Sequence, residues 1–107
     1  MVNCMDRHRS IQYQDNRIAL YIAQKGKCAI TGENLSIDDI HCHHILPRSL
    51  GGTDEYGNLI IVKETIHKLI HMTDVEVVRT AIQGYKLSTD KLKKFNALRL
   101  SAGKESI

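Results

Sequence analysis

The placement of histidine is the feature that most limits what this chain of 107 residues can fold into. The sequence holds six histidines, and five of them fall between residues 41 and 71. Three lie in the run 41–44, of sequence HCHH, and His67 and His71 follow after a segment rich in turn formers. Because imidazole both binds metal ions and transfers protons near neutral pH, this clustering indicates that a functional site would lie within residues 41–71.

Length and composition favour one globular domain. We expect it to cover residues 1–107, with flexible ends at 1–14 and 101–107. Hydrophobic residues make up 42% and charged residues 25%, which is typical of globular proteins. The longest aliphatic run, at 59–62, is far shorter than the roughly 20 residues that span a bilayer. The first ten residues also lack the apolar stretch of a signal peptide, so we expect no membrane partner.

The cysteines point to a reducing compartment. Cys4, Cys28 and Cys42 are odd in number and form no C-x-x-C pair. A disulfide framework is therefore not expected, and a four-thiolate zinc knuckle is excluded within one chain. We expect reduced thiols in a cytoplasmic protein.

The basic residues gather near the C-terminus. The net charge is only +3, but the segment from Gly84 onward is clearly more basic than acidic. A basic stripe of this kind suits a phosphate backbone, and a solvated helix face would have the same composition. The candidate DNA contacts in this segment are Lys91, Lys93 and Lys94.

Capping and turn residues divide the chain into short elements. Asp15 is a plausible N-cap and Gly26 a C-terminal stop for a first helix. Thr73 and Glu76 have the spacing of a capping box, and Ser88 or Thr89 can cap the last helix. The predicted elements are a helix at 16–25, strands at 37–46 and 59–62, and helices at 63–72, 74–83 and 89–100. This order predicts an α+β fold.

The spacing of the histidines predicts a metal site. His67 and His71 are four residues apart, so on a helix they lie one above the other and can bind one ion together. Two strands folded onto that helix would bring His43 or His44 to the same place. Three imidazoles leave coordination positions open, as a catalytic metal requires, and favour Zn, Ni, Co or Mn over Mg²⁺.

The segment from 39 to 71, which includes HCHHILPRSLGGTDEYGNL, resembles the HNH endonuclease motif. More narrowly, residues 15–71 resemble the endonuclease domain at the C-terminus of bacterial group II intron-encoded proteins. The resemblance implies a ββα-metal finger, made of a short β-hairpin and a helix. Around it we expect one N-terminal helix and two C-terminal helices.

The resemblance also implies roles for single residues. His44 matches the general base, and Asn58 matches the asparagine that holds the long loop and helps to orient the base. The matches to metal ligands are His43, His67 and His71. His41 shares a strand face with His43 and is an alternative ligand. Arg48 or Lys68 could add positive charge to the phosphate, although each could equally be a solvated cation.

Two departures from the family refine the metal prediction. His43 stands where many members carry Asp, so we expect Mn²⁺ foremost, and Ni²⁺ or Co²⁺, to support activity better than Mg²⁺; Zn²⁺ is a further candidate. The second departure concerns the two C-x-x-C pairs that hold a structural zinc in many members. Thr31, Lys63 and Ile66 occupy cysteine positions of those pairs, so no structural zinc knuckle is expected.

The expected function is that of a divalent-metal-dependent endonuclease acting on double-stranded DNA. The resemblance implies one metal ion, products with 5′-phosphate and 3′-hydroxyl ends, and cleavage of one strand at a time. Two alternatives stay open: a nucleic-acid-binding module without catalysis, and a structural metal-binding domain of a larger intron-type protein. The sequence leaves open whether the protein is a monomer or a dimer.

Overall fold

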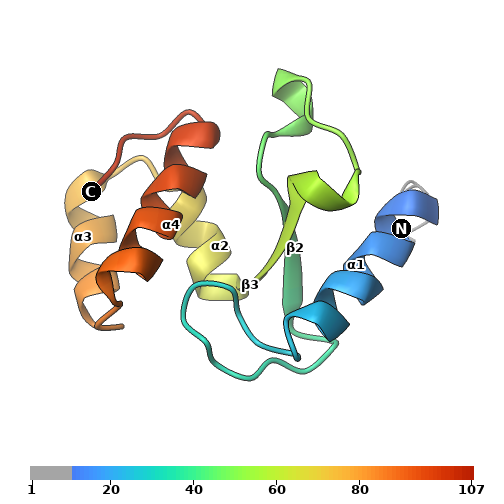
Figure 1. Cartoon of the computed structure of the whole chain (residues 1–107). Coiled ribbons are helices and arrows are strands. Elements are labelled where there is room, and N and C mark those ends of the chain that lie inside the picture. Colours follow the sequence, from blue (N-terminus) through green and yellow to red (C-terminus); the bar gives the residue numbers. More distant parts are fainter. Residues whose placement is uncertain (1–10) are drawn as a thin grey trace.

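The computed structural model describes residues 11–107 and has an α+β architecture (Figure 1). A β-hairpin runs directly into a helix, with one helix before this unit and two after it, which confirms the predicted fold class. The elements in order are α1 (Ile11–Ala23), β2 (Ile40–His44), 3-10 turns at Arg48–Leu50 and Tyr56–Asn58, β3 (Leu59–Lys63), α2 (Glu64–His71), α3 (Val75–Gln83) and α4 (Thr89–Ser101).

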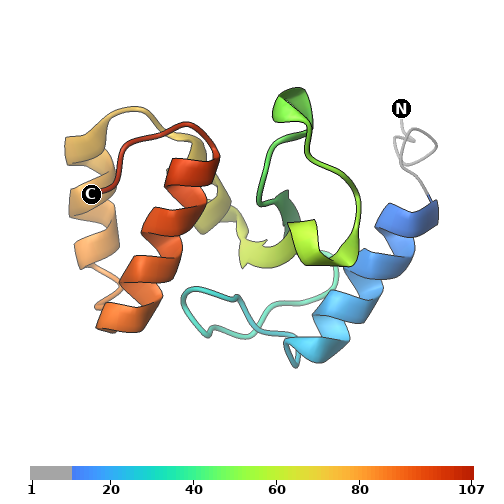
Figure 2. The same ribbon diagram turned by 45° about the horizontal axis from the view of Figure 1, so that its top comes forward.

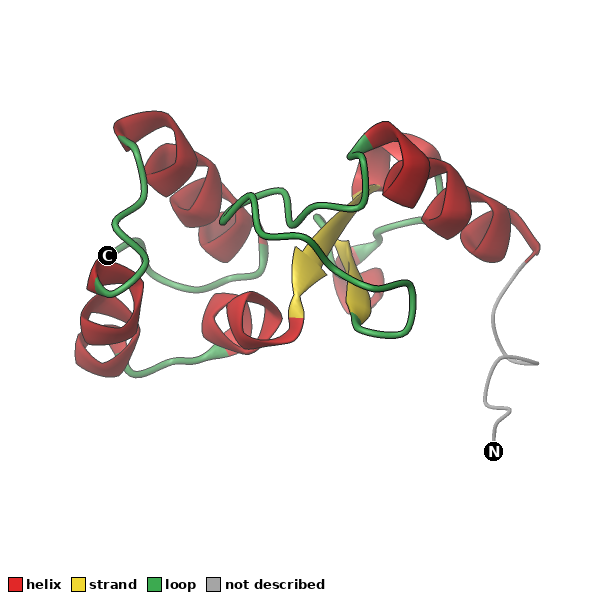
Figure 3. Ribbon diagram, turned by 90° about the horizontal axis from the view of Figure 1, so that it is seen from below, coloured by secondary structure: helices red, strands yellow, loops and turns green. Residues whose placement is uncertain are grey.

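The hairpin lies between α1 on one side and the three later helices on the other (Figures 1 and 3). β2 and β3 are antiparallel, with His44 opposite Leu59 at one end of the ladder. Because side chains alternate along a strand, Ile60 and Val62 join the core formed with α2, α3 and α4. Leu59 and Ile61 join a second core with α1. β3 is therefore buried on both faces, as its unbroken aliphatic run predicts.

Helix α1 extends further toward the N-terminus than its capping residue predicts. Asp15 lies inside the helix rather than at its start, and residues 11–14, expected to be a flexible end, form its first turn. Tyr13 in that turn is buried against the hairpin, so tertiary packing adds a turn that local signals do not indicate. Residues 1–10, which include Cys4, lie outside the described residues.

Two other boundaries differ from the sequence prediction. The first strand covers Ile40–His44 only, because the hairpin ladder gives partners to these five residues alone. Asp74, and not Thr73, caps α3 by accepting hydrogen bonds from the amides of Glu76 and Val77. Of the two predicted candidates for the cap of α4, Ser88 and Thr89, the structure has Ser88. No helix of residues 11–107 combines the length and apolar character needed to cross a bilayer.

Arg99 is part of the core and not of the basic surface. Its side chain is fully buried, and Nη1 donates hydrogen bonds of 2.6 and 2.7 Å to the carbonyls of Leu69 and Met72, at the C-terminal end of α2. Nε donates to the carbonyl of Glu105. Arg99 thus satisfies helix-end carbonyls that would otherwise lack partners.

The C-terminal segment folds back past α4 (Figures 1 and 2). The amide of Ile107 donates to Asn96, and the Ile107 side chain packs against the larger core. Residues 101–107, for which we expected flexibility, thus have partners in this structure, and their mobility stays a prediction.

We expect Arg99→Met to lower the free energy of unfolding by about 2–4 kcal/mol, because buried carbonyls at the end of α2 lose a charged donor. Urea unfolding followed by circular dichroism measures the change. Lys93→Met, an exposed cation on the same helix, is the matched control and should change stability by less than about 0.5 kcal/mol. Equal midpoints for the two variants would contradict a stabilising role for Arg99.

Candidate active site

Three imidazoles from two elements converge beside the hairpin. His43 comes from β2, and His67 and His71 lie one turn apart on α2, which begins directly after β3. Nitrogen atoms of the three rings all lie within 4.8 Å of one another. This spacing allows one ion to contact all three. His41 is the neighbour of His67, with 5.3 Å between ring centroids, but it is not part of this three-residue group.

The three rings are held in the neutral form that metal binding needs. Burial, followed by the effect of His67 and His71, lowers the pKa of His43 to about 3. Burial and then His71 lower the pKa of His67 to about 4. Burial also lowers the pKa of His71, with a smaller effect from Lys104. At neutral pH each ring therefore offers an unprotonated nitrogen.

His43 fits a metal better than it fits an ordinary core. Its side chain is only 1% exposed, and its Nε2 atom has no hydrogen-bond partner among the described residues. An unpaired buried nitrogen is costly, and coordination of a cation would remove that cost. The donor set of three imidazoles suits Zn²⁺, Mn²⁺, Co²⁺ or Ni²⁺. We conclude that His43, His67 and His71 could hold a divalent metal.

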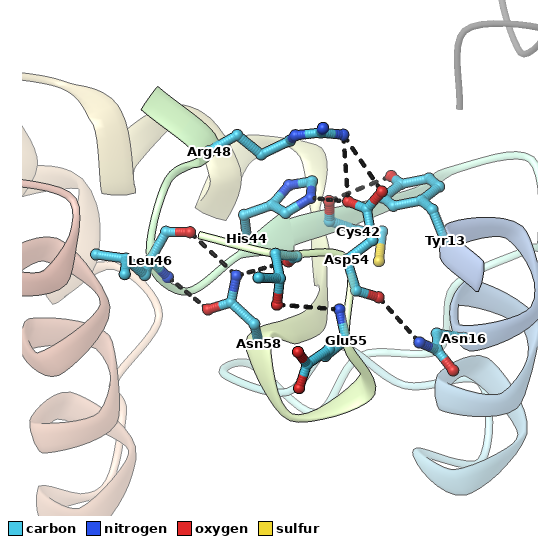
Figure 4. A network of polar contacts seen from close by, with 10 residues as sticks. Tyr13, Asn16, Cys42, His44, Leu46, Arg48, Asp54, Glu55 and Asn58 are labelled. Atoms are coloured by element: carbon cyan, nitrogen blue, oxygen red, sulfur yellow. Dashed lines mark hydrogen bonds and ion pairs between the residues drawn. The ribbon is translucent and has the colours of Figure 1, made fainter. Parts of the chain in front are cut away.

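His44 faces the other side of the strand and meets a separate set of groups (Figure 4). Its Nε2 atom lies 2.8 Å from Oδ1 of Asp54, and its ring stacks on Tyr13 of α1. Asp54 is 8% exposed and also pairs with Arg48 at 3.2 Å. The side-chain amide of Asn16 donates to the Asp54 carbonyl. The ring of His44 is thus supported from α1 and from the loop after β2.

Asn58 closes that loop through side-chain hydrogen bonds to backbone groups of the loop itself, and not to His44. Its Oδ1 accepts from the amide of Leu46, and its Nδ2 donates to the carbonyls of Leu46 and Thr53. Gly52 lies in the same tight loop, where an added Cβ would stand 1.7 Å from the Leu46 carbonyl oxygen. The loop therefore requires glycine at 52, and Asn58 sets the loop's shape.

One cavity joins the two sets of histidines. It has a volume of about 310 Å³, and its lining includes Arg48 together with His43, His44, His67 and His71. Neighbouring strand residues point to opposite sides, but His44 is the last residue of β2, and the cavity lining continues past the strand to Pro47 and Arg48. This placement lets two adjacent residues of opposite orientation line one cavity.

The other cationic candidates lie away from this cavity. Lys68 pairs with Glu64 on the surface of α2, and Lys91 donates to the carbonyl of Ala29. Lys91 and Lys94 line a separate hollow together with Lys27, and Lys93 is exposed. Of the five predicted nucleic-acid contacts, the structure brings Arg48 alone to the histidine cavity.

Sequence reasoning missed Asp54, Tyr13 and Asn16. Asp54 belongs to a segment whose composition predicts only a turn, and the two others lie on the first helix, far away in sequence. Their role follows from how the loop folds back onto α1. Local periodicity carries no signal for such a contact, although a carboxylate in a turn near a candidate base is the kind of residue to test.

The hairpin, the helix that follows and the cluster of histidines define a metal-binding module of the ββα type. Residues 26–71 match the family model described as HNH endonuclease. The match covers a little under half of the chain and includes every residue of the histidine cluster. It indicates nuclease activity in general terms. No curated protein and no solved structure matches the chain.

We expect His67→Ala to weaken metal binding by more than about 100-fold, because loss of a group that merely supports a ligand already costs up to that much. Titration calorimetry with Zn²⁺ and Mn²⁺ measures the affinity. His41→Ala is the matched control, since His41 neighbours His67 but lies outside the three-residue group. Similar losses in both variants would mean that the ligand set is wrong.

We expect the metal-free protein to lose stability as the pH falls below about 6.5. Below this pH the histidines of the unfolded chain bind protons. In the folded protein His43 and His67 stay unprotonated until the pH approaches their lowered pKa values of about 3 and about 4. The free energy of unfolding is therefore unaffected by these two histidines above pH 6.5 and decreases progressively below it. Thermal unfolding between pH 4 and 8 measures the trend, and His43→Leu should flatten it. A pH trend that His43→Leu leaves unaltered would refute this assignment.

Proposed function

We propose that the chain is a divalent-metal-dependent endonuclease that hydrolyses phosphodiesters of double-stranded DNA. The observation that carries this proposal is the single cavity that His44 shares with three neutral, converging imidazoles. A candidate general base and a candidate metal site within one small cavity are what hydrolysis of a phosphodiester needs. The family match at 26–71 supports the same reaction class.

The roles of the residues follow from the charges that the reaction develops. His44 takes a proton from the attacking water, which contributes roughly 10²–10⁴-fold to the rate. His43, His67 and His71 hold the metal. When bound, the metal stabilises negative charge on the phosphate and on the leaving 3′-oxygen. Asn58 keeps the loop closed, and Arg48 at the cavity rim contacts the phosphate. The products carry 5′-phosphate and 3′-hydroxyl ends.

The finer parts of the proposal rest on sequence. One histidine-lined cavity among the described residues supports cleavage of one strand per binding event, and imidazole donors support Mn²⁺ ahead of Mg²⁺. Lys91, Lys93 and Lys94 add affinity for the DNA backbone, and Lys68 is a weaker candidate for the same role. The likeness of residues 15–71 to endonuclease domains of group II intron proteins, and a cytoplasmic setting of bacterial or phage type, are further inferences from sequence.

A supercoiled plasmid assay tests the function. We expect chelator-treated protein resupplied with Mn²⁺, Ni²⁺ or Co²⁺ to produce open-circle DNA, and Mg²⁺ to support less. His44→Ala should cut at least about 10²-fold more slowly while metal and DNA binding persist, because only the proton acceptor is lost. Agarose gels with time points measure the rates.

One control variant and two possible outcomes separate the nuclease from the alternatives. His41→Ala, which changes a neighbouring imidazole on the same strand, should cleave at the wild-type rate. Folded, metal-loaded protein that binds DNA and cuts with none of the metals would instead establish a binding module. Protein that holds metal but neither binds nor cuts DNA would establish a structural metal domain.

A further inference from the structure

The contact between His44 and Asp54 determines which nitrogen of the base can accept a proton. Nε2 of His44 lies 2.8 Å from Oδ1 of Asp54, and both side chains are largely shielded, with exposures of 14% and 8%. A carboxylate can only accept hydrogen bonds, so Nε2 must carry the hydrogen. The guanidinium of Arg48, 3.2 Å from the other oxygen, favours the ionised carboxylate.

The lone pair of a neutral His44 ring is therefore on Nδ1. Figure 4 shows this second nitrogen directed away from Asp54. His44 also lines the cavity that His43, His67 and His71 share, which is where a phosphate and an attacking water would lie. The atom left to face the reaction is thus Nδ1.

Asp54 is itself held from two directions. Its carboxylate pairs with Arg48, and its backbone carbonyl accepts a hydrogen bond of 2.9 Å from Nδ2 of Asn16. The ring of His44 is also supported by Tyr13, whose ring stacks on it with an angle of 16° between the two planes. These contacts restrict rotation of the imidazole, as an oriented base requires.

We propose that Asp54 is the positioning residue of the base: it fixes His44 in the Nε2-protonated tautomer, so that Nδ1 takes the proton from water. This rests on the proposed nuclease function. The sequence resemblance implies that Asn58 helps to orient the base, and in the structure it does so indirectly, through the loop. Its amide shapes the loop that carries Asp54 and makes its hydrogen bonds to Leu46 and Thr53.

The substitution Asp54→Asn tests the proposal because it retains the shape and changes the donor pattern. The amide oxygen will turn to Arg48, which only donates, so the NH₂ group will face Nε2 of His44. That arrangement selects the opposite tautomer, with the proton on Nδ1. Glu55→Gln is the matched control, since Glu55 is the next residue, is exposed and makes no side-chain contact with His44.

Two readouts are combined on the full chain. Nitrogen NMR shifts of the His44 ring, recorded without metal at mildly alkaline pH, identify the tautomer directly. We expect an Nε2-protonated ring in the wild type and in Glu55→Gln, and an Nδ1-protonated ring in Asp54→Asn. Single-turnover plasmid cleavage with Mn²⁺ should fall by at least about 10²-fold in Asp54→Asn alone, with Mn²⁺ and DNA affinities within about twofold of the wild type.

The outcomes separate this inference from the nuclease proposal. A wild-type ring protonated on Nδ1, or Asp54→Asn with wild-type cleavage, overturns the role of Asp54. If the wild-type protein fails to cleave DNA with every metal tested, the nuclease proposal is refuted. The nitrogen shifts still identify the tautomer of His44 in that case. If Asp54→Asn fails to fold, the wild-type spectrum alone keeps the tautomer assignment open to refutation.

Discussion

The side-chain amide of Asn58 closes the loop between the two strands, and the arrangement of the cavity depends on that closure. The amide holds Leu46 at the start of the loop and Thr53 near its far side. The hairpin ladder ends at His44. The loop closed by Asn58 then folds back, so that Asp54 lies against the imidazole of His44. One amide therefore fixes both the end of the strand and the carboxylate that faces it, although it contacts neither ring nitrogen.

The metal candidate depends on a different physical balance. Burial disfavours the charged imidazolium, and a charge on one ring of the cluster would raise the cost of charging the next. The fold thus keeps His43 and His67 neutral, at the expense of an unpaired buried nitrogen on His43. Arg99 donates hydrogen bonds to the end of the helix that carries His67 and His71, so a guanidinium from α4 helps to hold both candidate ligands in place.

The sequence predicts those parts of the fold that local rules govern. Period-two and period-3.6 patterns locate the hairpin and α2, and the four-residue spacing of His67 and His71 places both rings on one side of the helix. The position of Asp54 depends instead on how residues 45–58 fold back, and no periodicity governs that path. The burial of Arg99 is not predicted for a related reason, because only the tertiary structure provides its carbonyl partners.

The alternation of side chains in β2 also explains why the site needs more of the chain than the family match covers. His43 points to α2, and His44 points to α1, where Tyr13 stacks on it. Asn16 of the same helix holds the backbone of Asp54. Both α1 residues precede residue 26, where the match begins. The metal candidate thus lies within the matched segment, whereas the contacts that support the proposed base, His44, include residues of α1.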